Sequence, residues 1–149
     1  MDKHKAEIVA RELMNSEFMK GEWYEGTLAS WLRQGCKCAY CDCNLLSSRD
    51  AAYFGWCNEH ILPKSQYPAL ADSEWNTVLA CRPCNQLKAR WDPNGEESGE
   101  RVYTTGALTQ EQAATLIGRV RTRIQDRRKV IELRFQQQRS AIENALRTA

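Results

Sequence analysis

Cys38-Ala-Tyr-Cys41 and Cys81-Arg-Pro-Cys84 are two C-x-x-C pairs, and the segment that they bracket decides the fold of this chain. Each pair can offer two thiolate ligands from one tight turn, and two pairs at this separation are typical of a four-thiolate zinc site. We therefore predict that these four cysteines bind a structural Zn²⁺ ion. Such a centre would pin the elements that carry the two pairs against each other.

The other cysteines leave one alternative open. The chain contains seven cysteines, an odd number, and C-x-x-C pairs in a reducing compartment indicate metal binding rather than disulfide bonds. Cys36 and Cys43 flank the first pair. We expect them to be spare thiols, because a C-x-x-C turn gives two sulfurs the better tetrahedral geometry. Either one remains an alternative zinc ligand.

The composition, with 42% hydrophobic and 27% charged residues, is that of an ordinary globular protein, and 149 residues suffice for one domain with a modest core. The net charge of +2 does not by itself indicate a nucleic-acid-binding protein. Residues 107–149, however, contain nine Lys and Arg against four Asp and Glu. The positive charge is thus concentrated in the C-terminal third, where it could contact phosphates.

The sequence contains no sign of membrane association. No apolar run approaches the ~20 residues that span a bilayer. The first residues, Met1-Asp-Lys-His-Lys5, lead into a charged helix rather than the apolar core of a signal peptide. We therefore expect a cytoplasmic protein with no membrane partner.

Two helices are predicted before the first cysteine pair, at residues 2–20 and 22–34. Gly21 is expected to end the first helix and Gly35 to cap the second. The apolar residues that should form the buried face of the first helix are Ile8, Val9, Leu13 and Phe18. We expect both helices to pack over the metal centre.

Short elements are predicted between and after the cysteine pairs. Residues 52–63 favour two strands that meet in a turn at Asn58. Residues 85–91 favour a short helix, which the Asp-Pro pair at 92–93 stops. A polar, glycine-containing loop follows.

A long helix is predicted from a capping box, Thr109-x-x-Gln112, to about residue 147. Its apolar residues follow a seven-residue repeat and are Ile117, Val120, Ile124, Ile131, Phe135, Ile142 and Leu146. A continuous helix would be ~60 Å long at 1.5 Å per residue, too long for the preceding domain to cover. Either the helix breaks near Gly118 or beyond and folds back, or the stripe over 107–147 contacts a second copy or a partner protein.

Chemistry is indicated by residues that zinc binding does not explain, namely Glu59-His60 between the cysteine pairs and Asn85 directly after the second. Hydrolysis of a phosphodiester needs a base that activates water and a cation near the leaving oxygen. A histidine can be that base, while a carboxylate and an amide oxygen can hold a hard divalent cation.

These groups occur in a recognisable order: Cys38-Ala-Tyr-Cys41, then Glu59-His60-Ile-Leu-Pro63, then Asn76-x-x-Leu-Ala-Cys81-x-x-Cys84-Asn85-x-x-Lys88. Over about residues 38–93 the chain resembles the HNH endonuclease family and its ββα-metal fold. The resemblance implies an α+β protein in which a ββα-metal core with a four-cysteine zinc site occupies residues 36–106. Residues 1–35 would then be an N-terminal helical segment and residues 107–149 a basic helical extension.

The resemblance also implies roles for individual residues. His60 would be the general base, Asn76 would brace the loop between the strands, Glu59 and Asn85 would bind the catalytic cation, and Lys88 and Arg90 would contact the substrate. The family more often has Asp where this chain has Glu59, whose side chain is one methylene longer. Amide ligation by Asn85 favours hard cations such as Mg²⁺ or Mn²⁺.

The expected function is metal-dependent hydrolysis of DNA, as nicking or double-strand cleavage. Small HNH proteins similar to this one occur in phages and in anti-phage defence systems, where a partner such as an ATPase can supply targeting. A non-catalytic, zinc-stapled nucleic-acid-binding module remains the alternative. For Lys88, Arg90 and the arginines after residue 118, a second interpretation also remains: these side chains face solvent and bind no ligand.

Overall fold

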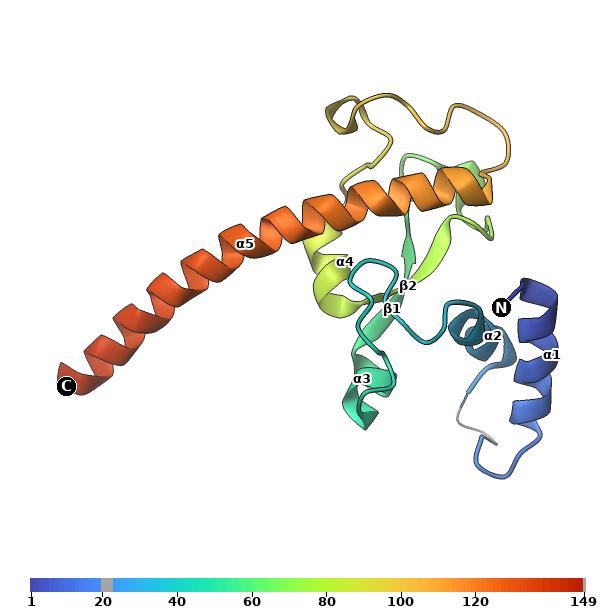
Figure 1. Ribbon diagram of the computed structural model, residues 1–149, viewed down its shortest axis with the longest axis horizontal. Coiled ribbons are helices and arrows are strands. Elements are labelled where there is room, and N and C mark those ends of the chain that lie inside the picture. Colours follow the sequence, from blue (N-terminus) through green and yellow to red (C-terminus); the bar gives the residue numbers. More distant parts are fainter. Residues whose placement is uncertain (20–22, 149) are drawn as a thin grey trace.

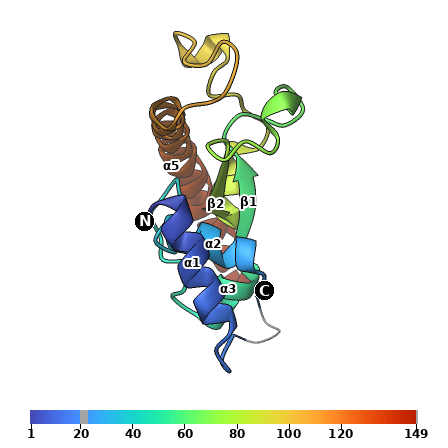
Figure 2. The same ribbon diagram turned by 90° about the vertical axis from the view of Figure 1, so that its right-hand side faces the viewer.

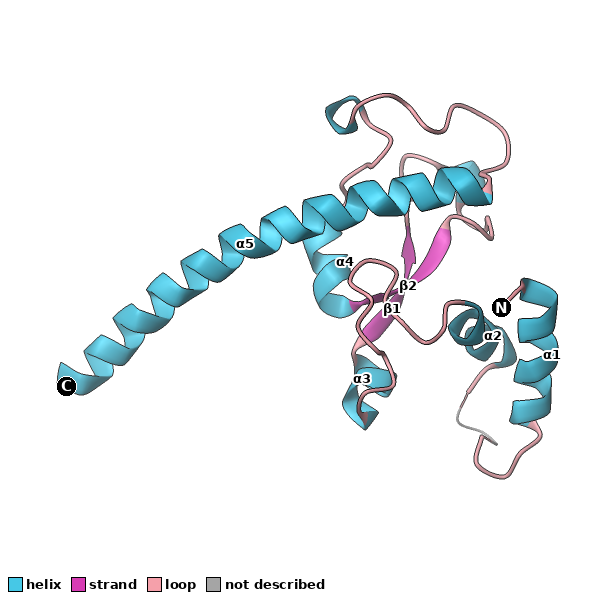
Figure 3. Ribbon diagram, viewed as in Figure 1, coloured by secondary structure: helices cyan, strands magenta, loops and turns pink. Residues whose placement is uncertain are grey.

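The computed structural model describes residues 1–19 and 23–148 and has a mixed α+β architecture, as predicted (Figure 1). Its elements are α1 (Lys3–Met14), α2 (Glu25–Arg33), α3 (Arg49–Phe54), β1 (Trp56–His60), the 3₁₀ turn Pro68–Leu70, β2 (Thr77–Cys81), α4 (Arg82–Lys88), the 3₁₀ turn Glu96–Ser98 and α5 (Gln110–Thr148). Figure 3 shows how little of the chain is strand.

One two-stranded antiparallel sheet lies at the centre, with the register running from Trp56 opposite Cys81 to His60 opposite Thr77. The predicted turn at Asn58 is wrong, because Asn58 lies within β1, opposite Leu79. The first part of that predicted strand is helix α3 instead. The Ser48 side chain accepts a 3.1 Å hydrogen bond from the amide of Ala51 and so begins this helix.

Helix α4 follows β2 without a loop. It starts at Arg82, three residues earlier than predicted, because Pro83 lies in the first turn, where a helix needs no amide donor. It ends at Lys88, before the Asp-Pro pair that was expected to stop it. Ala89 leaves the helical conformation with φ of +51°, a left-handed value that terminates the helix.

Helices α1 and α2 form the end of the molecule that lies opposite the free end of α5 (Figures 1 and 2). The predicted buried face of α1 is wrong: Ala6 and Ala10 are buried, whereas Ile8 and Leu13 are exposed and Phe18 is 91% exposed. Small side chains let α1 approach α2 closely. The predicted length of this helix, to residue 20, is also wrong, because α1 ends at Met14 with Asn15 as its C-cap; Gly21, which was expected to end it, lies outside the described residues.

The end of α2 matches the prediction. Gly35 has φ of +66°, and the next amide, that of Cys36, donates a 2.8 Å hydrogen bond to the carbonyl of Trp31. Trp31 in turn is buried in the same core as the cysteines Cys38 and Cys84. Helix α2 thus packs beside the cysteine cluster, and α1 packs on α2 rather than on the cluster.

Helix α5 is one continuous element of 39 residues, with no break at Gly118. Its predicted capping box is confirmed by reciprocal hydrogen bonds between Thr109 and Gln112, of 3.0 and 3.2 Å. Val120 and Ile124 are buried in the core that contains the cysteines. Farther along, the stripe leaves the domain, and Ile131, Phe135, Ile142 and Leu146 are 49%, 52%, 61% and 75% exposed.

The second half of α5 therefore projects from the domain as an uncovered helix (Figure 1). No helix in the described part of the chain is both long enough and apolar enough to cross a membrane.

Candidate functional site

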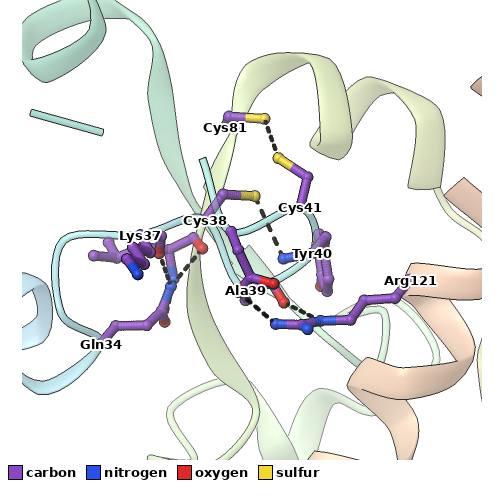
Figure 4. Close-up of polar contacts among 10 residues, drawn as sticks. Gln34, Lys37, Cys38, Ala39, Tyr40, Cys41, Cys81 and Arg121 are labelled. Carbon is purple, nitrogen blue, oxygen red and sulfur yellow. Dashed lines mark hydrogen bonds and ion pairs between the residues drawn. The ribbon is translucent and has the colours of Figure 1, made fainter. Parts of the chain in front are cut away.

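Four cysteine sulfurs converge beside the sheet. Cys38 and Cys41 lie in the loop after α2, Cys81 ends β2 and Cys84 lies in the first turn of α4. Their Sγ atoms all lie within 4.8 Å of one another, and those of Cys41 and Cys81 are 3.8 Å apart (Figure 4). Four zinc–sulfur bonds of ~2.3 Å in a tetrahedron give sulfur separations of ~3.8 Å. The cluster therefore fits a metal ion, consistent with structural zinc.

Backbone hydrogen bonds hold the first cysteine pair against β2. The amide of Ala39 donates to the carbonyl of Leu79 at 2.9 Å. The Gln34 side chain accepts from the amide of Leu79 at 2.9 Å and donates to its carbonyl at 2.7 Å. Gln34 also donates to the carbonyl of Lys37 (Figure 4). These hydrogen bonds satisfy the backbone at the edge of β2. They also hold the first cysteine loop beside the second, so that a metal ion would not have to order this loop alone.

The crowded thiols perturb one another. Hydrogen bonds from Cys81 and Cys84 lower the pKa of the Cys38 thiol strongly. The same hydrogen bonds to Cys38 raise the pKa of Cys81 to about 11 and raise that of Cys84. The four thiols are thus close enough to share protons, and a bound cation would have to displace those protons, because only thiolates ligate a metal.

The two spare cysteines do not join the cluster, which within the described residues consists of the four predicted ligands. Cys43 is exposed at the surface. Partial burial and a hydrogen bond with Cys41 raise the pKa of its thiol to about 12, and burial also raises the pKa of Cys36. The geometry thus favours Cys38 and Cys41 as the first ligand pair.

The imidazole of His60, at the end of β1, has a fixed orientation. Its Nε2 atom lies 2.9 Å from the carbonyl oxygen of Ala71. A carbonyl oxygen only accepts, so Nε2 carries the proton and donates it. In the neutral ring Nδ1 then has the free lone pair. His60 is half-buried and presents Nδ1 as a proton acceptor.

Asn76 is fully buried and holds the loop that contains Ala71. Its Oδ1 atom accepts a 2.8 Å hydrogen bond from the amide of Leu62. Its Nδ2 atom donates to the carbonyls of Leu62 and Leu70, at 3.2 and 3.1 Å. Asn76, at the end of the loop that joins β1 to β2, thus bonds both the start of this loop at Leu62 and the residue before Ala71. Through that carbonyl, Asn76 supports the orientation of His60.

Glu59 has a different environment from His60, because successive side chains of a strand point to opposite faces. Its Oε1 atom is 2.6 Å from Nζ of Lys88 on α4, and this ammonium also donates to the carbonyl of His60 at 2.9 Å. The side chain of Lys88 is only 1% exposed. Lys88 was expected either to contact the substrate or to face solvent. Instead its ammonium is buried inside the protein, where the carboxylate of Glu59 is its partner.

The remaining predicted residues lie along α4. Asn85 is half-buried and faces the thiol of Cys57, which shares a strand face with Glu59. Burial raises the pKa of Cys57, and hydrogen bonding with Asn85 partly offsets this. Arg90 is exposed beyond the end of α4.

A bound divalent cation does not fit this arrangement of Glu59 and Asn85. The carboxylate of Glu59 is already neutralised at 2.6 Å by Lys88. Among the residues that the structure describes, the cysteine cluster is the one group of three or more His, Cys, Asp or Glu side chains able to hold a metal.

Most of the arginines that suggested a nucleic-acid surface are bonded within the chain. Arg119 donates to two backbone carbonyls, and Arg127 donates to the carbonyl of Leu87. Arg121 donates to the carbonyl of Ala39 (Figure 4) and to the carboxylate of Asp42. The guanidinium of Arg123 lies over the ring of Trp91. Arg128 donates to Sγ of Cys84. Arg121, Arg127 and Arg128 thus fasten α5 to the first cysteine loop and to α4. Arg119 and Arg123 fasten it to the segment after α4. The charge pattern alone did not reveal this role.

Comparison of the chain with protein-family models, with curated proteins and with solved structures found no match.

Proposed function

We propose that this protein is an endonuclease that hydrolyses DNA phosphodiester bonds with His60 as the general base. The observation that carries the proposal is the hydrogen bond from Nε2 of His60 to the carbonyl of Ala71, which leaves Nδ1 available to a water molecule. The resemblance to HNH endonucleases gives the substrate class. An effector role in phage or anti-phage defence rests on that resemblance alone.

The proposed reaction uses the histidine in one step. Nδ1 of His60 takes a proton from water while the water oxygen bonds to phosphorus and the bond to the 3′ oxygen breaks. The departing 3′ oxygen takes a proton from solvent, which yields 5′-phosphate and 3′-hydroxyl ends. The Ala71 carbonyl stabilises the imidazolium that forms, because it accepts the proton on Nε2. Asn76 keeps this carbonyl in place.

The four-cysteine centre has a structural part in the proposal. A Zn²⁺ ion bound by Cys38, Cys41, Cys81 and Cys84 would join the first loop to the junction of β2 and α4. Since β2 pairs with β1, this anchors the strand that carries His60.

The proposal is tested by plasmid nicking with Mg²⁺ or Mn²⁺. We expect the wild-type chain to convert supercoiled DNA to open circles and His60→Ala to do so at least ~100-fold more slowly. His4→Ala is the matched control, since His4 is the other histidine and is exposed. Equal rates for wild type and His60→Ala would show that His60 is not the base.

One observation favours a second candidate, a zinc-stapled nucleic-acid-binding module without catalysis. The pairing of Glu59 with Lys88 occupies the carboxylate that a catalytic cation would need. This candidate predicts no cleavage with either metal, and binding to DNA that survives His60→Ala. A gel-shift titration of both chains, beside the nicking assay, separates the two functions.

A further inference from the structure

The free half of α5 repeats, at intervals of eleven residues, an apolar pair that the buried half begins. The three pairs are Val120 and Ile124, Ile131 and Phe135, and Ile142 and Leu146. Eleven residues make about three turns of helix, so the pairs lie on one face of α5. The first pair is buried in the domain core, whereas the four residues of the other two are between 49% and 75% exposed. The free half thus exposes the same face that the domain covers farther back.

The domain restricts how a second α5 can lie on this face. As far as Ile124 the face is occupied by the chain's own core, which includes Leu79 and Cys84. In a parallel, in-register pair the second helix would carry its own domain at the same level and on the facing side. The two domains would then collide and hold the helices apart. In an antiparallel pair the second domain lies at the other end, so the two exposed faces can meet.

The charges beside the stripe also fit antiparallel pairing. A two-fold axis can place Ile131 of each chain opposite Ile142 of the other. In this register Glu132 of each chain lies beside Arg139 of the other, at the positions that flank the apolar layers of a coiled coil. Both side chains are exposed in the single chain. In a parallel, in-register pair Arg139 would instead lie beside Arg134 of the second copy, and the two guanidinium groups would repel each other.

We propose that the free half of α5 forms an antiparallel coiled coil with a second copy of this chain, in which Ile131 packs on Ile142 and Glu132 pairs with Arg139. The helices overlap for about 20 residues, or ~30 Å, and the two domains lie at opposite ends of the pair. The pairing uses no residue of the site around His60 and does not depend on the proposed reaction.

A hollow between α4 and α5 fits the same register. Its volume is about 830 Å³, and its walls include Leu87, Arg127 and Ile131. The residue that lies opposite Arg127 is Leu146 of the second copy, whose side chain is 75% exposed in the single chain. The hollow therefore receives an apolar side chain at the point where the stripe reaches the domain.

The test is sedimentation equilibrium of the full chain with single reversed charges. Glu132→Arg and Arg139→Glu should each weaken self-association about tenfold or more, because two attractive pairs become repulsive. The two variants mixed in equal amounts should associate about as tightly as wild type, because each reversed charge then faces its opposite in the other chain. This recovery is specific to antiparallel pairing, in which positions 132 and 139 meet.

Lys129→Glu is the matched control, because Lys129 is exposed and lies on the side of the helix opposite Ile131. Its self-association should equal that of wild type. Arg139→Glu also removes a 2.7 Å ion pair with Glu143 of the same chain, but this loss is the same in the free and in the paired helix. Circular dichroism checks that each variant keeps its helix content.

Four results would overturn the proposal. A monomeric wild type would exclude self-pairing. Tighter association of Arg139→Glu alone would indicate a parallel pair, because the repulsion from Arg134 would be relieved. An absence of recovery in the mixture would show that Glu132 and Arg139 do not meet. A loss in Lys129→Glu as large as in the other two variants would show that the stripe is not the interface.

Discussion

Arg128 donates a 3.0 Å hydrogen bond from its guanidinium to Sγ of Cys84. One cysteine of the four-cysteine cluster is therefore bonded directly to α5, although the two residues are far apart in the sequence. A four-thiolate zinc centre has a net negative charge, and a guanidinium at one sulfur offsets part of it. The cluster and the C-terminal helix should consequently depend on each other.

Arg128→Gln is expected to weaken zinc retention about tenfold, as loss of a partner bonded to a metal ligand typically does. The measurement is the rate of zinc transfer to a chromogenic chelator. Lys129→Gln is the matched control, because Lys129 is exposed and has only a 3.4 Å contact with Asp126. Equal rates in the two variants would contradict a role for Arg128 at the cluster.

Replacement of cysteines should separate ligands from spare thiols. Cys84→Ser is expected to reduce bound zinc and to unfold the core, because Cys84 is buried among the hydrophobic residues as well as within the sulfur cluster. Cys43→Ser should leave one zinc per chain and an unchanged melting temperature. Metal analysis and circular dichroism check both. Loss of zinc in Cys43→Ser would assign this cysteine to the metal instead.

Asn76→Ala is expected to destabilise the fold by about 3 kcal/mol, because three hydrogen bonds to buried backbone groups are lost. Urea unfolding measures this. Asn44→Ala, at an exposed position with one side-chain bond to the amide of Leu46, should lose less than ~1 kcal/mol. In the nicking assay, Asn76→Ala should lower kcat more than DNA affinity, since it releases the loop that orients His60.

The exposed stripe on α5 is expected to bind a second copy of the chain, because it continues the face that packs on the core. Light scattering should give the mass of two chains. Ile131→Glu with Phe135→Glu should give monomers. Leu133→Glu is the control, since Leu133 is 65% exposed but lies on the opposite side of the helix from Ile131. A monomeric wild type would rule out self-association and leave the stripe to a different partner.

Local chemistry made several features predictable from the sequence. The four cysteine ligands follow from the tight geometry of a C-x-x-C turn, and the start of α5 follows from side-chain bonds between Thr109 and Gln112. Gly35 at the end of α2 follows from its tolerance of positive φ. In each case the determining contacts lie within a few residues of one another, or within one cluster of four sulfurs that fits a metal ion.

Features that depend on packing between distant elements were not predictable in this way. Periodicity marked Ile8 and Leu13 as core, but nothing in the described fold covers that side of α1. The sequence placed Lys88 one turn beyond Asn85 but could not tell that the rotation of α4 turns its ammonium toward Glu59. The hydrogen bond between His60 and Ala71 likewise depends on how a loop returns to the sheet.

Cys81 is the last residue of β2, the N-cap of α4 and a member of the sulfur cluster. If the cluster binds zinc, loss of the ion would affect more than the cluster itself, since it would free the strand end and the helix start together. A chain synthesised while the cell is short of zinc would present this junction to proteases. The amount of intact protein in the cell should accordingly follow zinc supply, even at a constant rate of synthesis.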